Sequence, residues 1–251
     1  MNFRLKAFGL HLAGSAVILS LVLGGLYLGW YHWPGWYLTG VSSVVPVLAG
    51  VDLALGPLLT LVIASPAKPR RELARDVGII AAIQIIALAY GSVQLWNGRP
   101  LYYAYSETVL QVVQAYDIDP AEAALARERN LPLAPHWYSL PRWIWAPLPQ
   151  EPAERERIMG SAMSGGTDVI GMPRYYRPWE QGLPALRAQL KPVDQVGYFV
   201  GRQKKQLEER MQAAGLPVDK ANAIPFTGRG RALLAVLDPE RATLLGLFAY
   251  Q

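Results

Sequence analysis

The chain contains no cysteine and only three histidines among its 251 residues. Without thiols it can form no disulfide bond, no thiolate metal site and no cysteine-dependent catalytic centre. Charged residues are also scarce. They make up 17% of the chain, whereas roughly a quarter of the residues in a typical soluble domain are charged. This scarcity indicates that a large part of the chain avoids water.

The few charges are distributed unevenly along the chain. Residues 1–95 carry few charged side chains, and residues 96–251 carry most of them. The formal net charge is +5 and the isoelectric point is about 9.4, but neither part has the dense basic patch of a nucleic-acid-binding protein. We attribute the basic isoelectric point to Lys and Arg residues that flank membrane segments, and we expect no nucleic-acid partner.

Three long apolar runs occupy residues 7–29, 41–64 and 77–95. Each meets or approaches the roughly 20 residues that a helix needs to cross about 30 Å of hydrocarbon. The first run is too long for a signal peptide and lacks a small-residue cleavage site after it. We therefore expect residues 1–95 to form a three-helix transmembrane domain in a lipid bilayer and residues 96–251 to form a separate domain.

The charges between the runs predict the orientation of the chain. Basic residues precede the first run and fill the loop between the second and third, whereas the loop between the first and second is uncharged. By the positive-inside rule, this places the N-terminus in the cytoplasm and the C-terminal domain on the outer side of the membrane. The uncharged loop is predicted to carry an interfacial aromatic belt, formed by Trp30, Tyr31, Trp33, Trp36 and Tyr37.

Asp52 is a carboxylate near the middle of the second span. An ionisable group at that depth costs about 3 kcal/mol or more and usually faces a partner, not lipid. Pro57 removes one backbone hydrogen bond and is expected to kink the helix. Gly50 and Gly56 are expected to let a neighbouring helix approach closely.

Two interpretations of Asp52 remain open. In the first, a protonated Asp52 is hydrogen-bonded to Gln84 or Ser20, which lie at similar depth, and holds the three helices together. In the second, Asp52 and Gln84 form a polar contact for a transmembrane helix of another protein. A proton relay is less favoured because the spans hold few titratable groups, and His11 is predicted to lie at the membrane interface.

Residues 96–251 have the pattern of an α+β domain with an antiparallel sheet. The expected helices are an Asp119-capped segment that runs to about residue 130, followed by residues 152–163, 179–189 and 193–214. The expected strands form a hairpin at residues 101–105 and 108–115, a short strand at 143–145, and a second hairpin at 232–237 and 243–250.

The search for catalytic chemistry in this domain finds no strong motif. Residues 96–251 contain one histidine, His136, so they hold no histidine metal cluster. No Gly-x-Ser-x-Gly elbow frames a serine, and the glycine loop before Asp168 lacks the ending of a phosphate-binding loop, so Asp168 is predicted to cap a turn. We expect no catalytic residue, no cofactor and no metal.

An aromatic segment at residues 173–179 is the candidate recognition surface of this domain. Tyr175, Tyr176 and Trp179 are of the types that dominate interface hot spots, so we name them, with Asp52 and Gln84, as candidate partner-binding residues. The alternative is that these aromatics cover the core of their own domain.

Several segments together resemble one protein family. Residues 3–9 with His11, Gly50-Val51-Asp52 and residues 55–61 resemble the start of the TfpX/TfpZ family of type IV pilin accessory proteins. Residues 88–91 and 99–102 are similar to the family's third span and its exit, and residues 173–176 and 228–238 are similar to its outer domain.

The resemblance implies a non-enzymatic inner-membrane accessory protein or chaperone that assists the stability or assembly of a type IV pilin. Such a protein would contact the transmembrane helix of the pilin, its head domain, or both, and self-association stays open. The alternative function is a membrane-tethered periplasmic enzyme or sensor acting on an envelope component. A deep outer pocket with convergent polar groups would favour this alternative, whereas an exposed apolar surface would favour the accessory protein.

Overall fold

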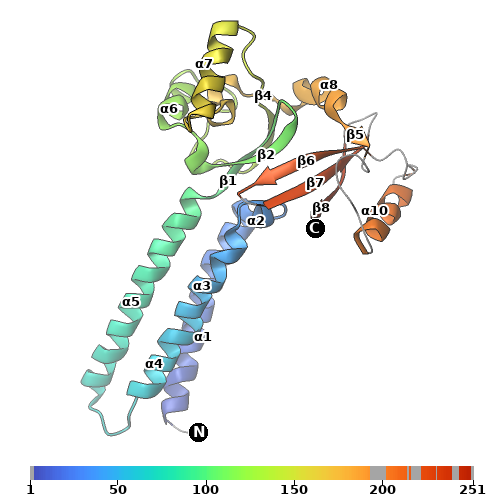
Figure 1. Cartoon of the computed structure of the whole chain (residues 1–251). Coiled ribbons are helices and arrows are strands. Elements are labelled where there is room, and N and C mark those ends of the chain that lie inside the picture. Colours follow the sequence, from blue (N-terminus) through green and yellow to red (C-terminus); the bar gives the residue numbers. More distant parts are fainter. Residues whose placement is uncertain are drawn as a thin grey trace. The chain divides into compact units, whose positions relative to one another are not determined.

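The computed structural model describes residues 3–192, 202–213, 215, 222–229, 231–238 and 243–249 (Figure 1). The chain divides into two compact units. The membrane unit comprises Met1–His32 and Gly40–Gly98, and the C-terminal unit comprises Trp33–Thr39 and Arg99–Gln251. The short segment between the first two spans therefore belongs with the C-terminal unit, although it is far from it in sequence.

Three apolar helical spans of 29, 23 and 28 residues form the membrane unit, which confirms the prediction of three long apolar helices near the N-terminus. By their length and composition they embed the chain in a membrane. The first span is α1 (Phe3–Leu26), which continues into the π-helical turn η1 (Tyr27–Tyr31). The third is a single helix, α5 (Arg70–Asn97), which begins seven residues before the predicted apolar run.

The second span is irregular. It consists of η2 (Val41–Ser43), α3 (Val45–Ala49), the π-helical turn η3 (Gly50–Leu55) and α4 (Gly56–Ile63). Pro57 stands in the first turn of α4, directly after the π-turn, and it lacks the amide that would donate a hydrogen bond to the preceding helical turn. The second span is irregular just before this proline, and the kink expected there stays a prediction.

The first and third spans also meet at one end through aromatic side chains. The Tyr31 hydroxyl donates a 2.6 Å hydrogen bond to the Leu95 carbonyl. Trp30 lies edge-on to Trp96, with ring centroids 4.9 Å apart. Two members of the predicted aromatic belt therefore join helix ends within the membrane unit.

The C-terminal unit is built on one mixed sheet with the strand order β4-β3-β1-β2-β6-β7-β8, with β5 paired to β6. The pairs β1/β3 and β2/β6 are parallel and the other pairs are antiparallel. This confirms the predicted α+β fold. The sheet is mostly antiparallel, as predicted, but its two parallel pairs were not predicted. The strands are β1 (Pro100–Ser106), β2 (Val109–Gln114), β3 (Arg142–Trp145), β4 (Arg177–Pro178), β5 (Lys191–Pro192), β6 (Asn222–Gly228), β7 (Arg231–Leu237) and β8 (Leu244–Ala249).

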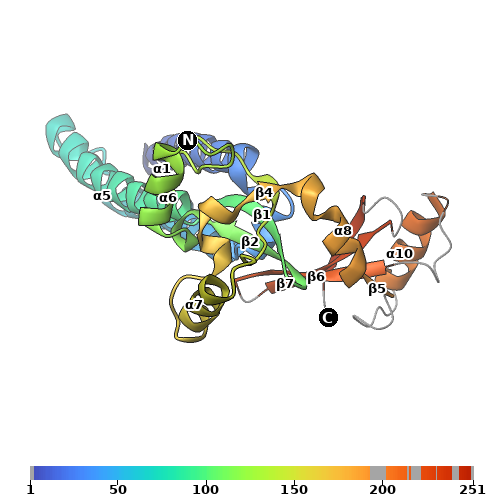
Figure 2. The same ribbon diagram turned by 90° about the horizontal axis from the view of Figure 1, so that it is seen from above.

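The helices of this unit match the predicted ones closely. They are α6 (Pro120–Glu128), α7 (Pro152–Met163), α8 (Trp179–Gln189) and α10 (Arg202–Ala213). The Asp119 carboxylate caps α6 by accepting hydrogen bonds from two backbone amides, at 2.8 and 3.2 Å. Residues 193–201 and 214 of the last predicted helix lie outside the described residues. Figure 2 shows α7 and α10 at opposite ends of this unit, with sheet strands between them.

Strand β6 was not predicted because Pro225 interrupts its pattern. A proline has no amide to donate, so it is rare in a strand with neighbours on both sides. Here the pairing with β2 begins only after the proline, at Leu110↔Phe226, while the antiparallel pairing with β7 runs through it.

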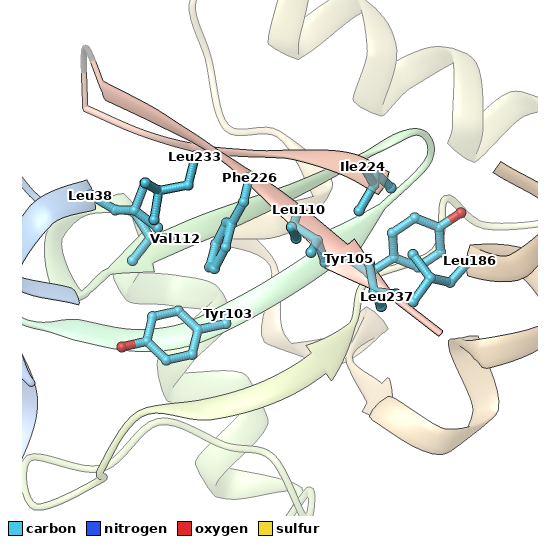
Figure 3. Packing of buried hydrophobic residues seen from close by; sticks show 11 residues of the cluster. Leu38, Tyr103, Tyr105, Leu110, Val112, Leu186, Ile224, Phe226, Leu233 and Leu237 are labelled. Atoms are coloured by element: carbon cyan, nitrogen blue, oxygen red, sulfur yellow. The ribbon is translucent and has the colours of Figure 1, made fainter. Parts of the chain in front are cut away.

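The main core of the C-terminal unit lies between the sheet and α8 (Figure 3). It includes Leu38 of the short helix α2 (Gly35–Leu38), whose side chain is fully buried. The Arg229 amide donates a 3.0 Å hydrogen bond to the Leu38 carbonyl. Tyr37, predicted to lie in an interfacial belt, instead packs against this core. The other buried members are Tyr103, Tyr105, Leu110, Val112, Leu186, Ile224, Phe226, Leu233, Ala235 and Leu237.

Candidate intramembrane binding site

Four polar side chains from all three spans meet inside the membrane unit. His11 of α1 contacts Thr60 of α4 through Nδ1 at 2.6 Å and Gln84 of α5 through Nε2 at 2.6 Å. The Gln84 amide group donates to Asp52 of η3, at 3.1 Å to its backbone carbonyl and at 3.5 Å to its carboxylate Oδ1. We call these four residues the polar network.

The direction of donation along the network follows from the groups involved. Gln84 donates to Asp52 through its NH₂, so its Oε1 accepts from His11. His11 must therefore carry its proton on Nε2. The Nδ1 atom of His11 contacts the Thr60 hydroxyl, so hydrogen bonds link Thr60 through His11 and Gln84 to Asp52.

Backbone irregularity and a missing side chain create room for this network. The π-turn widens the second span at Asp52, and such turns are frequent at functional sites. Gly56 lies one helical turn further on, and a Cβ atom there would come within 2.2 Å of the Gln84 side chain. Gly56 is therefore required for Gln84 to reach Asp52. A Cβ atom on Gly50, by contrast, would meet nothing within 4 Å, so the predicted close approach at Gly50 is wrong.

A cavity of about 440 Å³ opens over the polar network, and residues from all three spans line it. Its size falls within the range of about 300–1,000 Å³ that is common for ligand sites. Asp52, Thr60 and Gln84 are buried, whereas the wall residues Leu10 and Ile85 are exposed. The other wall residues are Ala7, Gly14, Ser15, Ile18, Val77, Ala81 and Leu88. The site therefore offers a buried polar floor between apolar walls.

The structure brings Asp52 and Gln84 together, as one of the predicted pairings requires. Ser20, the other predicted partner of Asp52, is exposed and does not line the cavity. His11 was predicted to lie at the membrane interface, and the structure shows that its ring links α1 to α4 and α5 as part of the polar network. The rule that an ionisable residue within a span marks a site could have identified it, since α1 begins eight residues earlier, at Phe3.

The predicted aromatic surface of the C-terminal unit is placed differently. Tyr176 is buried, its hydroxyl donates to the Ile170 carbonyl, and its ring lies 4.9 Å from that of Tyr102. Burial raises the pKa of the Tyr176 phenol well above its ordinary value. Trp179 packs on the main core, and the Tyr175 hydroxyl bonds to Glu154. These positions match the alternative in which the aromatics pack their own domain.

The other polar residues singled out in this unit have structural contacts. Asp168 accepts a 2.6 Å hydrogen bond from the Val169 amide, which confirms the predicted turn cap. The His136 ring stacks on Tyr138 with centroids 5.2 Å apart. Within the described ranges, no three His, Asp or Glu side chains form a group that could hold a metal ion.

Comparison with curated proteins gives two relatives from Dichelobacter nodosus that match nearly the whole chain. "Fimbrial assembly protein, serogroup I" is 25% identical and "Fimbrial assembly protein, serogroup E1" is 24% identical, each over 241 residues. These alignments cover 94% of this chain and 91% of each relative. The chain is a distant homologue of these fimbrial assembly proteins.

A third fimbrial assembly protein of the same organism, from serogroups C1 and C2, is 28% identical over 116 residues, which are 46% of this chain and 88% of the relative. No protein-family model matches the chain, and no solved structure matches it significantly. Because the two longer alignments cover 94% of the chain, the homology to the fimbrial assembly proteins includes both units.

Proposed function

We propose that this protein is a non-enzymatic accessory factor for pilus assembly that acts on a type IV pilin, as members of the TfpX/TfpZ family do. The observation that carries the proposal is the near-full-length homology to two fimbrial assembly proteins. The protein resides in the inner membrane with its N-terminus in the cytoplasm, and its C-terminal unit faces the periplasm, where pilin heads lie before assembly.

The cavity above the polar network supplies the contact within the membrane. Before assembly, a pilin holds an apolar helix in the bilayer. The exposed walls at Leu10 and Ile85 offer van der Waals contact to such a helix, and Gly14 and Ala81 let it approach closely. A polar group on the incoming helix would hydrogen-bond to the Asp52 carboxylate, which lines the cavity and has acceptor sites beyond its contact with Gln84. Such a bond avoids leaving that group unsatisfied in hydrocarbon.

Two contacts on one chain would strengthen each other. Once the pilin helix occupies the cavity, contact of the pilin head with the C-terminal unit becomes intramolecular. Linkage of this kind raises overall affinity by about 10²–10⁴ without any new interaction. The proposed factor can thus hold an unassembled pilin with two individually weak contacts.

Site-specific photocrosslinking in cells that assemble pili tests this proposal. Ile85 and Ile86 are neighbours on α5 and both are exposed, but only Ile85 lines the cavity. A photoreactive residue at position 85 is expected to crosslink to the pilin, and one at position 86 is expected to crosslink at least several-fold less. Equal pilin adducts at both positions would rule out the cavity as the contact. Absence of pilin adducts at both positions would count against the proposed function.

A further inference from the structure

Three large side chains project from one short loop of the C-terminal unit. Trp137, Tyr138 and Leu140 are 73%, 57% and 54% exposed. Single exposed apolar residues are common on soluble surfaces, but these three lie within four consecutive residues. Trp and Tyr rings favour the boundary between water and lipid, because one end of the ring is apolar and the other carries a hydrogen-bonding group.

Two arginines anchor this loop through its backbone. Arg99 Nη2 donates a 3.2 Å hydrogen bond to the Trp137 carbonyl, and Arg127 Nη1 donates a 3.1 Å hydrogen bond to the Pro135 carbonyl. Within the loop, the His136 amide donates to the Oγ of Ser139, at 3.0 Å. These bonds fix the backbone of the loop that carries the exposed side chains.

The same arginines line a cavity of about 270 Å³. Its ionisable lining residues are Arg99, Arg127 and His136, and none of the described residues that line it is acidic. The cavity therefore has a positive character that suits an anion. Arg127 is exposed, and a guanidinium carries five N–H donors in a planar fork that matches the oxygens of a phosphate.

The chain also restricts where this cavity can lie. Arg99 is the second residue after α5 ends at Asn97, and a residue spans at most about 3.6 Å. The backbone of Arg99 therefore lies within about 7 Å of the end of α5, a helix long and apolar enough to cross a membrane.

We propose that the cavity at Arg99 and Arg127 binds the phosphate of an anionic phospholipid headgroup, while the Trp137, Tyr138 and Leu140 side chains insert into the membrane interface. The positive charge of the cavity and the apolar rings beside it match the two parts of such a lipid. The site lies in the C-terminal unit and uses none of the intramembrane cavity residues, so it is separate from the proposed contact with the pilin helix.

The absence of cysteine from the chain allows a direct test with the full-length protein. A nitroxide spin label is attached at Leu140→Cys, and separately at Met163→Cys on α7, which is 88% exposed and serves as the control. In bilayers of phosphatidylcholine with phosphatidylglycerol, the label at 140 is expected to be accessible to oxygen dissolved in lipid and protected from a water-soluble nickel chelate. The label at 163 is expected to remain accessible to the chelate. Equal chelate accessibility at both positions would overturn the insertion.

Lipid binding is measured by titrating the detergent-solubilised full-length protein with phosphatidylglycerol and counting bound lipids by native mass spectrometry. Arg127→Gln is expected to weaken binding roughly fivefold, the effect of removing one basic residue from an anionic lipid surface. Arg155→Gln is the matched control, because Arg155 is also an exposed arginine on a helix and does not line the cavity. Equal affinities of Arg127→Gln and Arg155→Gln would overturn the headgroup site. If Arg127→Gln weakened the binding of phosphatidylcholine as much as that of phosphatidylglycerol, the site would not select anionic lipid, and the proposal would be overturned.

Discussion

The Gln84 side chain of the third span forms hydrogen bonds to both of the other spans. It accepts from His11 of the first span and donates to Asp52 of the second. Measured hydrogen bonds between transmembrane helices contribute about 0.6 kcal/mol on average. The larger cost comes from losing one partner, because the group left behind stays unsatisfied in hydrocarbon. The network therefore specifies how the helices fit together more than it stabilises them.

Two glycines of the same span provide a matched test of this packing. Gly56→Ala places a Cβ atom within 2.2 Å of the Gln84 side chain, whereas Gly50→Ala meets nothing within 4 Å. We expect Gly56→Ala to lower the free energy of unfolding by about 1–3 kcal/mol, as overpacked sites do. Gly50→Ala should change it by no more than about 0.5 kcal/mol. Thermal unfolding in detergent micelles measures both, and similar midpoints for the two variants would contradict the tight fit at Gly56.

Substitutions at Asp52 separate hydrogen bonding from charge. Asn keeps an acceptor for the Gln84 amide, whereas Leu removes it and retains only the bond to the backbone carbonyl. Because the carboxylate contact is long, at 3.5 Å, Asp52→Leu should cost only about 0.6 kcal/mol. We expect pilus assembly to be preserved in Asp52→Asn and reduced in Asp52→Leu, as judged by surface pili per cell. Equal loss in both variants at unchanged protein level would show that an ionised carboxylate is required.

At the scale of elements, α2 has a role that its length does not suggest. This four-residue helix lies between the first two spans in sequence, yet its Leu38 side chain is fully buried in the core of the C-terminal unit. The Arg231 guanidinium also lies over the Tyr37 ring, 5.0 Å from its centroid. A soluble fragment that begins after the third span would lack this piece of its own core.

The turn between β6 and β7 holds α2 in place through a close backbone approach. A Cβ atom on Gly228 would lie 2.2 Å from the Leu38 carbonyl oxygen, whereas one on Gly160 of α7 would meet nothing within 4 Å. We expect Gly228→Ala to destabilise the C-terminal unit by about 1–3 kcal/mol and to speed hydrogen exchange at residues 35–39. Gly160→Ala should be neutral or stabilising by about 0.5–1 kcal/mol, because alanine favours a helix more than glycine does. Unchanged exchange at residues 35–39 in Gly228→Ala would contradict the docking of α2.

At the scale of the whole molecule, the orientation in the membrane is a prediction that rests on charge. Basic residues lie before the first span and between the second and third, so these regions are expected in the cytoplasm. A reporter that is active only outside the cytoplasm should work when fused after Gln251 and fail when fused after Pro69. The two positions flank a single span, so activity at Pro69 would reverse the assignment.

Much of the architecture could be predicted because it depends on local properties of the chain. Hydropathy over about 20 residues predicts a span wherever it occurs. Likewise, the Asp119 cap and the regular patterns of residues 152–163 and 179–189 predict their helices from adjacent residues alone. Each of these features requires only residues of one segment, so it can be predicted without knowing how the rest of the chain folds.

The features that were missed all depend on residues distant in sequence. His11 enters the polar network only because α1 packs beside α4 and α5. Leu38 becomes a core residue only because its backbone packs closely against Gly228. Strand β6 exists because β7 pairs with it along its whole length and β2 pairs with it after Pro225. A hydrogen bond or a buried contact has no energy until both partners are present. Tertiary packing therefore decided which polar residues meet in the membrane and which loop completes the C-terminal core.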